Sequence, residues 1–564
     1  MFTNLLIACS ELEKAQPKTS EIPEDILQLV PAGITAQDVR GMLSTDDSTE
    51  SRIVVIRAAY AALSTIAQAV TDGQSNEKND AETLTEIADR ITKIIVPVCA
   101  GASLDHDSTD YATLSRLGEL GLRALDQLAQ IFPSPLPLSL PSSTLLRITA
   151  FTSPADPWTT AASCTLSPRL LSHFLETQPQ PQRTQLIVDE ILTKFLRPLF
   201  SKSRPSAVTA SGRKAEFAEP GRRDPAADRE TPEAKPWKYA HRYAITVFAW
   251  AVRQADPLLL QTHWPLYTPA LLTLLDDPDL RTRTRGLVLL RSFWARCPAG
   301  LMQETGLADV FEAAVFPALS YLPTLTPEGE SLELLREAYP VLIEMAGLEY
   351  MATAASGGDD ATTGGAGLPV KGDKSKEEKG EEKEAKSRQI TERERKLLDK
   401  IVREGLLMGY HHAKEHVRLV GLFCETLTCI VNGMGILAVK HLKELIPMVS
   451  EILTDPFGTK HPPTLSSAIL LLQAILRACW PRIPRYCNEI VKMLMLSWLN
   501  IADEESFQPD DDNANALKAK LAETADMLSA VMKAAHVDLS ERVMPLIEKE
   551  PQLDNLFNRN KNYP

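Results

Sequence analysis

The sequence lacks the cysteine spacings of a disulfide framework or a zinc site. Its eight cysteines are scattered over 564 residues without a Cys-x-x-Cys pair, whereas both kinds of site need cysteines at short, regular intervals. We therefore expect reduced, mostly buried thiols and no metal or other cofactor. The cysteines are Cys9, Cys99, Cys164, Cys297, Cys424, Cys429, Cys479 and Cys487.

Long apolar runs and strand patterns are also missing. No window approaches about 18 uncharged apolar residues, the length that suggests a membrane-spanning helix. The opening MFTNLLIACSELEK has no basic region before its short apolar run, so no secretory signal is predicted. Prolines outnumber glycines, 39 to 26, which suits the ends of many short helices better than a sheet, because proline removes ladder donors. We expect an all-α protein of the cytoplasm and nucleus with no membrane partner.

The chain has no excess of basic residues. Its formal net charge is −14, whereas a general nucleic-acid binder needs basic surface to displace counterions from phosphates. Hydrophobic residues make up 44% of the chain against 24% charged residues, which is enough apolar surface for a sizeable core. The expected partners are therefore proteins, and we expect no nucleic-acid partner.

Two polar stretches interrupt the helical pattern. One begins SKSRPSAVTASGRK at Ser201 and the other ATAASGGDDATTGG at Ala352. Small, charged, glycine and proline residues cannot bury enough apolar area to offset the entropy of ordering. We predict a disordered linker at 201–236 and a disordered low-complexity insert at 351–390, the charged part of which is a solvated tether. The remaining parts are an N-terminal helical region and two sets of HEAT-like repeats, at 1–200, 237–350 and 391–564.

A helical hairpin occurs twice in the sequence. The stretch from Pro269 to Pro298 has the pattern of a helix, an acidic turn, a second helix and a stop. Its PALLTLLDDP aligns with PMVSEILTDP from Pro447, and its GLVLLRSFWARCP with AILLLQAILRACW from Ala468. One helix pair cannot bury its apolar stripe alone, so pairs stack and share a core, as in HEAT and armadillo arrays. The repeat predicts an all-α, HEAT/armadillo-like α-solenoid of stacked antiparallel helix pairs.

The turn of the hairpin carries acids followed by bases. Asp276, Asp277 and Asp279 fall where the first helix should end, so their carboxylates can accept N–H groups of the second helix. Asp277 and Arg283 have the spacing at which HEAT units commonly place an acid and a base that link adjacent turns. Arg281 and Arg285 could face solvent or a partner. The predicted structural repeat positions are Pro269, Asp277, Arg283, Gly286, Pro447 and Asp455.

Several longer phrases resemble one family in particular. They are THWPLYTPALLTLLDDPD from Thr262, YLPTLTPEGES from Tyr321, GILAVKHLKELIP from Gly435 and ACWPRIPRY from Ala478. Over roughly 237–500 the chain is similar to the Tel-two-interacting protein two family, whose members are HEAT-like subunits of the TTT co-chaperone complex. The region 1–200 contributes nothing to this resemblance.

The resemblance implies a non-enzymatic adaptor with two partner subunits. These are a Tel-two-like protein and the larger Tti-type HEAT protein. Together they would support the stability and maturation of phosphatidylinositol-3-kinase-related kinases, with the heat-shock-protein-90 chaperone system. An unrelated HEAT scaffold, karyopherin-like or phosphatase-scaffold-like, is the alternative class of binding protein.

One segment is the candidate partner-binding site. Aromatic residues and arginine contribute much of the binding energy where they are exposed at interfaces, and WPRIPRY combines both types. We expect it and the helix after it to face a partner. Its residues are Trp480, Pro481, Arg482, Ile483, Pro484, Arg485 and Tyr486.

A remote enzymatic alternative rests on HAKEH, which matches the His-x-x-Glu-His pattern of inverted zinc peptidases. On one helix, His412 and His416 would lie one turn apart and could bind zinc, with Glu415 as the base. A third ligand could only be guessed among Glu444 and Glu489. The commoner interpretation of such a short motif is a solvated polar helix face, and we expect no enzymatic activity.

Overall fold

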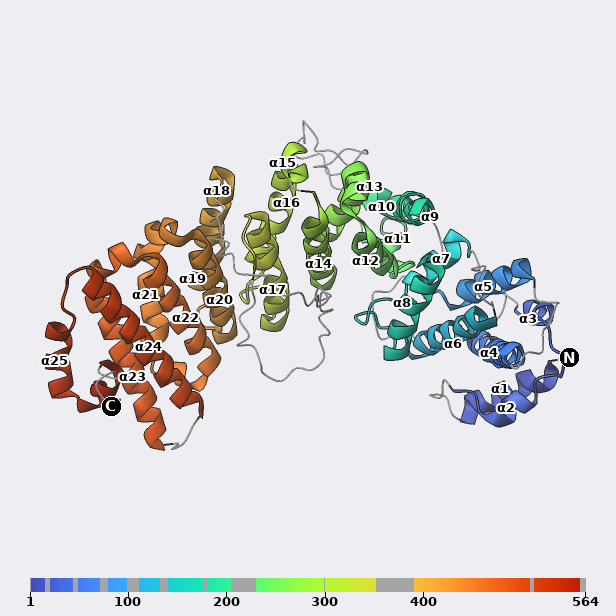
Figure 1. Ribbon diagram of the computed structural model, residues 1–564, viewed down its shortest axis with the longest axis horizontal. Helices are drawn as coiled ribbons and strands as arrows, with labels where there is room; N and C mark the ends of the chain where they lie inside the picture. The colour runs from blue at the N-terminus through green and yellow to red at the C-terminus, as the bar shows by residue number, and fades with distance from the viewer. Residues whose placement is uncertain are drawn as a thin grey trace, which may run out of the picture. The chain divides into compact units, whose positions relative to one another are not determined.

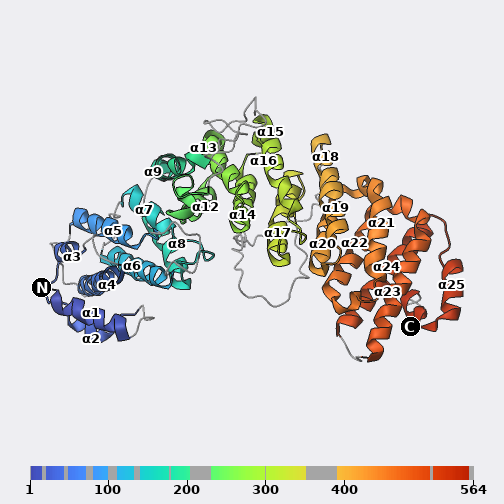
Figure 2. The same cartoon turned by 180° about the vertical axis from the view of Figure 1, so that it is seen from behind.

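The structure is a computed structural model, and every regular element that it describes is helical. It describes residues 2–15, 21–43, 49–71, 80–98, 111–131, 140–176, 180–203, 230–298, 300–350, 390–507 and 512–557. No strand occurs in these ranges, and the helices stack as antiparallel pairs (Figures 1 and 2). The predicted all-α solenoid class is therefore confirmed. The predicted disordered linker at 201–236 is wrong at its ends, because residues 201–203 form a short helix and Ala234 and Lys235 are buried. The rest of the predicted disorder, at 204–229 and 351–389, lies outside the described residues.

The chain divides into two compact units. Unit 1 is made from Met1–Leu274 and Ser292–Leu307, and unit 2 from Leu275–Arg291, Ala308–Asp359 and Lys371–Pro564, each as far as its residues are described. The border crosses the second helix of the hairpin that begins at Pro269. Each unit has its own core and is described separately.

Unit 1 packs its longest helices side by side. Helix α6 lies against α4, α5 and α8, and two of its glycines make this possible: a Cβ on Gly118 would collide with the ring of Phe151, and one on Gly121 with Ile95. The helices are α1 (Thr3–Ala15), α2 (Glu24–Gln28), α3 (Ala36–Met42), α4 (Thr49–Thr71), α5 (Ala81–Ile95), α6 (Tyr111–Ile131), α7 (Ser142–Thr149), α8 (Ala161–Glu176), α9 (Gln180–Gln185), the π-helix η2 (Leu186–Leu196), α10 (Arg197–Phe200), the 3-10 helix η3 (Ser201–Ser203), α11 (Pro236–Tyr239), α12 (Ala244–Gln254), α13 (Pro257–Leu275) and α15 (Leu301–Glu304).

Unit 2 is a double layer of helices. Its helices are α14 (Leu280–Arg296, shared with unit 1), α16 (Leu307–Val315), η4 (Phe316–Ser320), α17 (Glu328–Met345), α18 (Glu392–Lys400), the π-helix η5 (Ile401–Leu407), α19 (Met408–Ala413), α20 (Val417–Met434), η6 (Gly435–His441), α21 (Leu442–Thr454), η7 (Gly458–Lys460), α22 (Pro462–Ala478), η8 (Trp480–Arg485), α23 (Cys487–Phe507), α24 (Asp512–Ala534), α25 (Ser540–Lys549), η9 (Pro551–Leu553) and α26 (Asp554–Phe557). Except for the π-helix η5, the η elements of this unit are 3-10 helices.

One layer of unit 2 consists of α20, α22 and α24, which run in parallel. The hydroxyl of Thr464 donates to the carbonyl of Val417, 2.7 Å away, so α20 and α22 begin at the same edge. Further along, the amide of Gln473 donates to the hydroxyl of Thr524 at 3.1 Å and ties α22 to α24. The other layer contains α21 and α23, which pack on each other. The apolar faces of the two layers meet in a shared core.

The repeat prolines do not lie where we expected them. Helix α13 begins at Pro257 and α21 at Leu442, so Pro269 and Pro447 lie inside helices instead of starting them. An interior proline costs about 3 kcal/mol, because it removes one helical hydrogen bond and crowds the preceding turn. Burying leucines such as Leu271 and Leu274, both fully buried, contributes about 1.5–3 kcal/mol each. Tertiary burial therefore outweighs the local preference.

Two helical stretches are long and apolar enough to cross a membrane by length and composition. They are Ser51–Thr71 and Val417–Thr454, and 56% of the apolar window is buried inside the structure in each. The second stretch spans α20, η6 and α21, which pack on their neighbours in unit 2. Burial of this kind is what core helices of a solenoid require. The absence of a membrane partner stays a prediction.

The close approach at Gly121 makes a stability prediction. Gly121→Ala should lower the unfolding midpoint of unit 1, costing about 1–3 kcal/mol, because the added methyl overpacks Ile95. The matched control is Gly41→Ala in α3 of the same unit, where an added Cβ meets nothing within 4 Å. That change should be neutral or stabilising by up to about 1 kcal/mol. Scanning calorimetry of both variants checks this, and equal midpoints for the two would contradict the packing of α5 on α6.

Candidate protein-binding surface

The two predicted repeat turns have the same local geometry. In the first, a carboxylate oxygen of Asp277 accepts from the backbone N–H of Asp279 at 3.0 Å. In the second, Asp455 accepts from the N–H of Phe457, also at 3.0 Å. Each aspartate thus closes a tight turn through the residue two positions later. Asp279 then caps α14, because its carboxylate accepts from the N–H of Thr282 at 2.9 Å.

The base of the first turn is buried beside its acid. Asp277 and Arg283 are 2% and 8% exposed, and the Nε of Arg283 donates to the backbone carbonyl of Asp277 at 3.2 Å. The guanidinium also lies over the ring of Tyr321, 4.7 Å from its centroid. Arg283 therefore ties the turn to the chain that follows η4 through a cation–π contact as well as a hydrogen bond.

The other predicted repeat positions differ in exposure. Gly286 is buried in α14, Pro269 is half-buried and Pro447 is exposed. Arg281 is exposed and Arg285 is half-buried. Of these positions, only Gly286 has the buried environment that close packing of a second helix requires.

The predicted partner-binding segment forms the 3-10 helix η8 and the residue after it. Ile483 is fully buried, Trp480 is 50% exposed, and Pro484 and Tyr486 are half-buried. The side chains of Pro481, Arg482 and Arg485 are exposed. The segment is therefore anchored by one side chain and presents the others at the surface.

Two exposed apolar residues near this segment were missed from the sequence. Ile436 and Leu437, in η6, are 54% and 38% exposed. They follow Gly435, whose φ of +55° ends α20. Since α20 and α22 run in parallel, η6 and η8 lie at the same end of this helix pair. The Gly-Ile-Leu run was the available signal, but its apolar character pointed equally to the core.

Most of the described cysteines have the properties of inert thiols. None of the cysteines that the structure describes forms a disulfide bond. Burial raises the pKa of Cys9 and Cys479 to about 11 and that of Cys297 to about 12. A buried thiol with a raised pKa is a poor nucleophile at neutral pH. Cys99 lies outside the described residues.

The structure does not form the helix on which the zinc alternative depended. Helix α19 ends at Ala413, and His416 stands before the first residue of α20 with φ −98° and ψ 89°. The Nδ1 of His416 lies 3.3 Å from a carboxylate oxygen of Glu328, while His412 is exposed. Throughout the described ranges, no group of three or more His, Cys, Asp or Glu residues could hold a metal ion. The two histidines therefore do not share a helix face.

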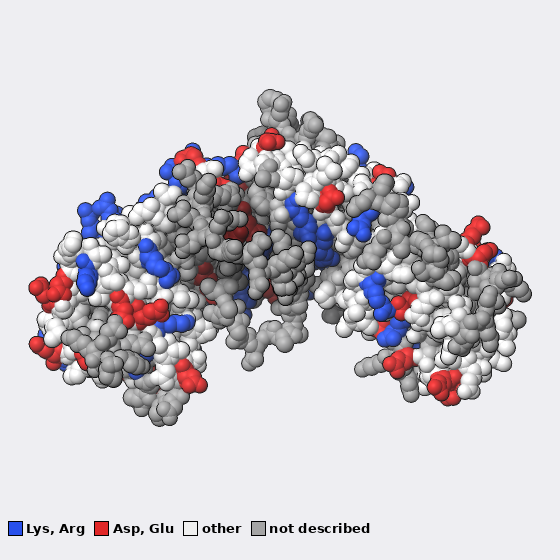
Figure 3. Space-filling view, viewed as in Figure 1, with Lys and Arg blue, Asp and Glu red and all other residues white. Residues whose placement is uncertain are grey.

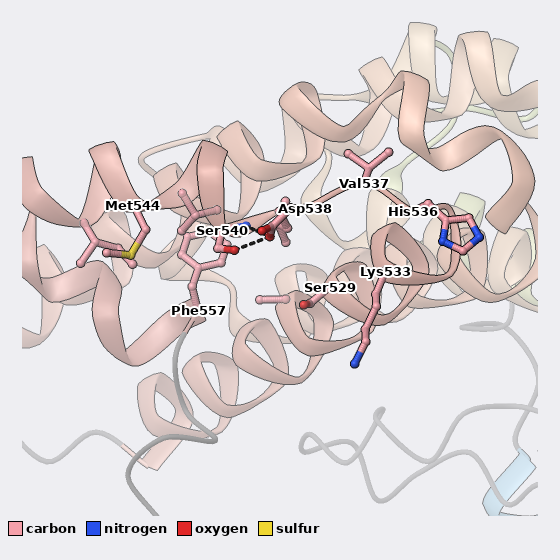
Figure 4. Close-up of a pocket in the computed structure, with 12 residues that line it drawn as sticks. Ser529, Lys533, His536, Val537, Asp538, Ser540, Met544 and Phe557 are labelled. Atoms are coloured by element: carbon pink, nitrogen blue, oxygen red, sulfur yellow. Dashed lines mark hydrogen bonds between the residues drawn. The ribbon is translucent and has the colours of Figure 1, made fainter.

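A cavity of about 540 Å³ lies between α24 and α25 (Figure 4). Asp538 accepts from the N–H of Ser540 at 2.9 Å, and His536 lies apart from this pair. His536 has φ +58°, the left-handed conformation that ends α24. Asp538 and Ser540 thus stabilise the start of α25, and His536 ends α24.

The visible charges do not form a field of one sign. On the face shown in Figure 3, lysine and arginine side chains are interspersed with aspartate and glutamate. Elsewhere in the described part of the chain, opposite charges pair directly, as Arg291 does with Glu344 at 2.7 Å and Lys400 with Glu312 at 3.1 Å. A surface of this kind suits contacts with proteins better than a phosphate backbone.

The sequence matches the Tti2 family over residues 144–460. It is 22% identical over 393 residues to TELO2-interacting protein 2 of Homo sapiens, a match that covers 68% of this chain and 65% of that protein. Among solved structures, a Kap121p mutant is similar at a TM-score of 0.38 and 12% identity, over 96% of this chain and 52% of the other. The karyopherin Kap121p bound to the SUMO protease Ulp1p is similar at 0.39 and 11%, over 97% and 46%. Likeness at this level does not distinguish one class of helical protein from another.

The described helices define a protein of the α-solenoid class, with an exposed edge in unit 2 that carries apolar and basic side chains. The family match covers more than half of the sequence, from α7 to η7. The chain belongs to the Tti2 family, and the resemblance inferred from its hairpin phrases is confirmed.

The stability of unit 2 should depend on pH through the contact between His441 in η6 and Asp399. Burial lowers the pKa of His441, although Asp399, whose carboxylate lies 3.0 Å from its Nε2, acts in the opposite direction. The unfolded chain therefore takes up this proton first, near pH 6.5, and unit 2 should lose stability as the pH falls from about 7 to about 5. Asp399 has a lowered pKa and stays ionised over this range.

The measurement is the shift of the urea midpoint of unit 2 between pH 7.5 and 5.5. His441→Gln should reduce this shift, because the titrating ring is gone. His412→Gln, which changes an exposed histidine, should leave it unchanged. An identical shift in the wild type and His441→Gln would contradict the assignment.

Proposed function

We propose that the chain is a scaffold subunit of a TTT co-chaperone complex, without enzymatic activity of its own. In this role it binds a Tel-two-like protein and the larger Tti-type HEAT protein. The complex then supports the stability and maturation of phosphatidylinositol-3-kinase-related kinases together with the heat-shock-protein-90 system. The observation that carries the proposal is the family match over residues 144–460. The human relative is named TELO2-interacting protein 2, which points to the same kind of partner.

The construction of the helical units supports a scaffold. Neighbouring helices share their apolar seams, so the backbone that carries the exposed side chains is held in place without a ligand. Large apolar side chains remain at the surface: Leu325 is 93% exposed, Phe457 79% and Trp480 50%. Stable complexes of permanent subunits bury large, apolar interfaces. Exposed residues of this kind are what such an interface would cover.

The same role implies where the protein works. We propose that the chain works in the cytoplasm and the nucleus, as expected from its sequence. Association with them is direct or through the other subunits.

Co-expression with the two proposed partners tests the function. The full chain, the Tel-two-like protein and the Tti-type protein should elute together from size exclusion in a fixed ratio. A chain without residues 391–564, most of unit 2, should lose the larger partner if that unit carries the interface. Affinity purification from cells with mass spectrometry should recover the same two proteins.

The outcome also separates the competing scaffold class. A transport receptor would bring down a small GTPase in place of two large helical proteins. Recovery of such a GTPase, or failure of all three purified chains to associate at micromolar concentration, would refute the proposal. Zinc in the purified protein above about one tenth of an equivalent would reopen the peptidase alternative, because catalytic zinc sites are close to fully loaded.

A further inference from the structure

Part of unit 2 is free of acidic residues. The chain has 74 aspartates and glutamates, yet none lies between Asp455 and Glu489. This stretch includes α22 and η8 and contains Lys460, Arg477, Arg482 and Arg485. Lys460 precedes α22 and pairs with Glu504, whereas Arg477, Arg482 and Arg485 lie at or beyond the C-terminal end of this helix. A chain with a net charge of −14 thus carries three arginines at that one end.

The backbone holds two of these arginines on one face. Residues three apart eclipse each other on a 3-10 helix, so Arg482 and Arg485 in η8 (Trp480–Arg485) point the same way. The N–H of Arg482 donates to the carbonyl of Cys479 at 3.0 Å, and that of Tyr486 to Ile483 at 2.8 Å. Both arginines are exposed, and among the described residues neither has an ion-pair partner.

The backbone of this segment has little conformational freedom left to lose when the segment binds a partner. Pro481 and Pro484 fix two φ angles, and the fully buried side chain of Ile483 anchors the turn in the core. A surface that is ordered before binding avoids part of the entropic cost of association. Each guanidinium group is a planar fork of N–H donors that can bind a carboxylate through two hydrogen bonds.

Exposed apolar side chains lie at the same end of the α20–α22 helix pair as the arginines. Trp480 is 50% exposed, Ile436 54% and Leu437 38%. Asp399, an acid that contacts η6, is already bonded to Lys440 and His441. The surface formed by Ile436, Leu437, Trp480, Arg482 and Arg485 is called the basic edge below.

We propose that the basic edge binds a segment of a protein partner that combines acidic and apolar residues. Its carboxylates would pair with Arg482 and Arg485, and its apolar side chains would cover Trp480 and the η6 residues. Tryptophan and arginine are the residues that most often dominate binding energy at interfaces. The inference rests on the proposed function only in taking the partner to be a protein.

The charges favour a peptide over a nucleic acid as the occupant. Two arginines beside three apolar side chains provide few phosphate contacts, and acidic residues are interspersed with basic ones on the face drawn in Figure 3. Sequence-independent binding to a phosphate backbone needs an extended basic surface. A short acidic segment needs only the local one.

A synthetic probe tests the proposal without any TTT partner. The probe is a fluorescein-labelled 16-residue peptide of glutamate, leucine and phenylalanine, titrated with the full chain and followed by fluorescence anisotropy. Arg482→Glu with Arg485→Glu should weaken binding at least about tenfold, because two charge-assisted contacts become repulsive. Binding to the wild type should also weaken between 0.05 and 0.5 M salt, as the Debye length shrinks.

The control is a double variant that changes the net charge by the same amount as Arg482→Glu with Arg485→Glu, but at other sites of unit 2. Arg281 and Arg418 are both exposed, and Arg418 lies at the opposite end of α20 from η6. Arg281→Glu with Arg418→Glu should bind the peptide as the wild type does. Trp480→Ala should weaken binding while leaving the salt dependence unchanged, and circular dichroism checks that each variant is folded.

Two results would overturn the proposal. One is equal weakening by the two double variants, which would reduce the effect to overall charge. The other is tighter binding of a single-stranded RNA of the same length than of the peptide. A chain that binds the peptide as expected but does not assemble with the two proposed subunits would contradict the proposed function alone.

Discussion

Burial of the seams between parallel helices is the interaction on which unit 2 depends. Helix α22 buries Leu471, Leu472, Ile475 and Leu476 completely between its neighbours. Each such side chain contributes about 1.5–3 kcal/mol, whereas an exposed ion pair such as Lys414 with Glu451 contributes about 0–1 kcal/mol. Burial of apolar side chains between the helices, and not surface ion pairing, therefore provides most of the free energy that stabilises their stacking.

Buried polar contacts then fix how far each helix is shifted along the next. Thr464 is bonded to α20, and Gln473 to α24. A buried hydrogen bond adds little net stability, but a buried polar group without a partner is costly. A shifted register would leave the side chains of Thr464 and Gln473 without their hydrogen-bond partners. The fixed register brings η6 and η8 to one end of their helices, where the basic edge is formed.

The hairpin could be predicted from the sequence because its signals are local. An aspartate two positions from its N–H partner closes the turn whatever lies around it, and the aligned Asp-Pro pairs predicted both turns. The first residues of the helices were harder to predict from the sequence. Pro269 and Pro447 suggested helix ends by local preference, but burial of the leucines that follow Pro269 overrode it. His412 and His416 appeared to share a helix because nothing in the motif reveals that α19 stops at Ala413.

The surface was only partly accessible from the sequence, because exposure depends on neighbours that are distant along the chain. WPRIPRY pointed to a partner contact, yet its composition could not separate the buried Ile483 from the half-exposed Trp480. Ile436 and Leu437 have the character of core residues. They become surface residues because Gly435 ends α20 and turns the chain across its end.

The ties between neighbouring helices also bear on how the chain acquires its structure. Thr464 and Val417 are 47 residues apart, and Gln473 and Thr524 are 51 apart. Each contact can therefore form as soon as the next helical hairpin has left the ribosome. Protein domains generally fold as units during synthesis. Stacked pairs of this kind can consolidate one after another while translation continues. At any moment, only the most recently synthesised helix pair then has an apolar face that no neighbour covers.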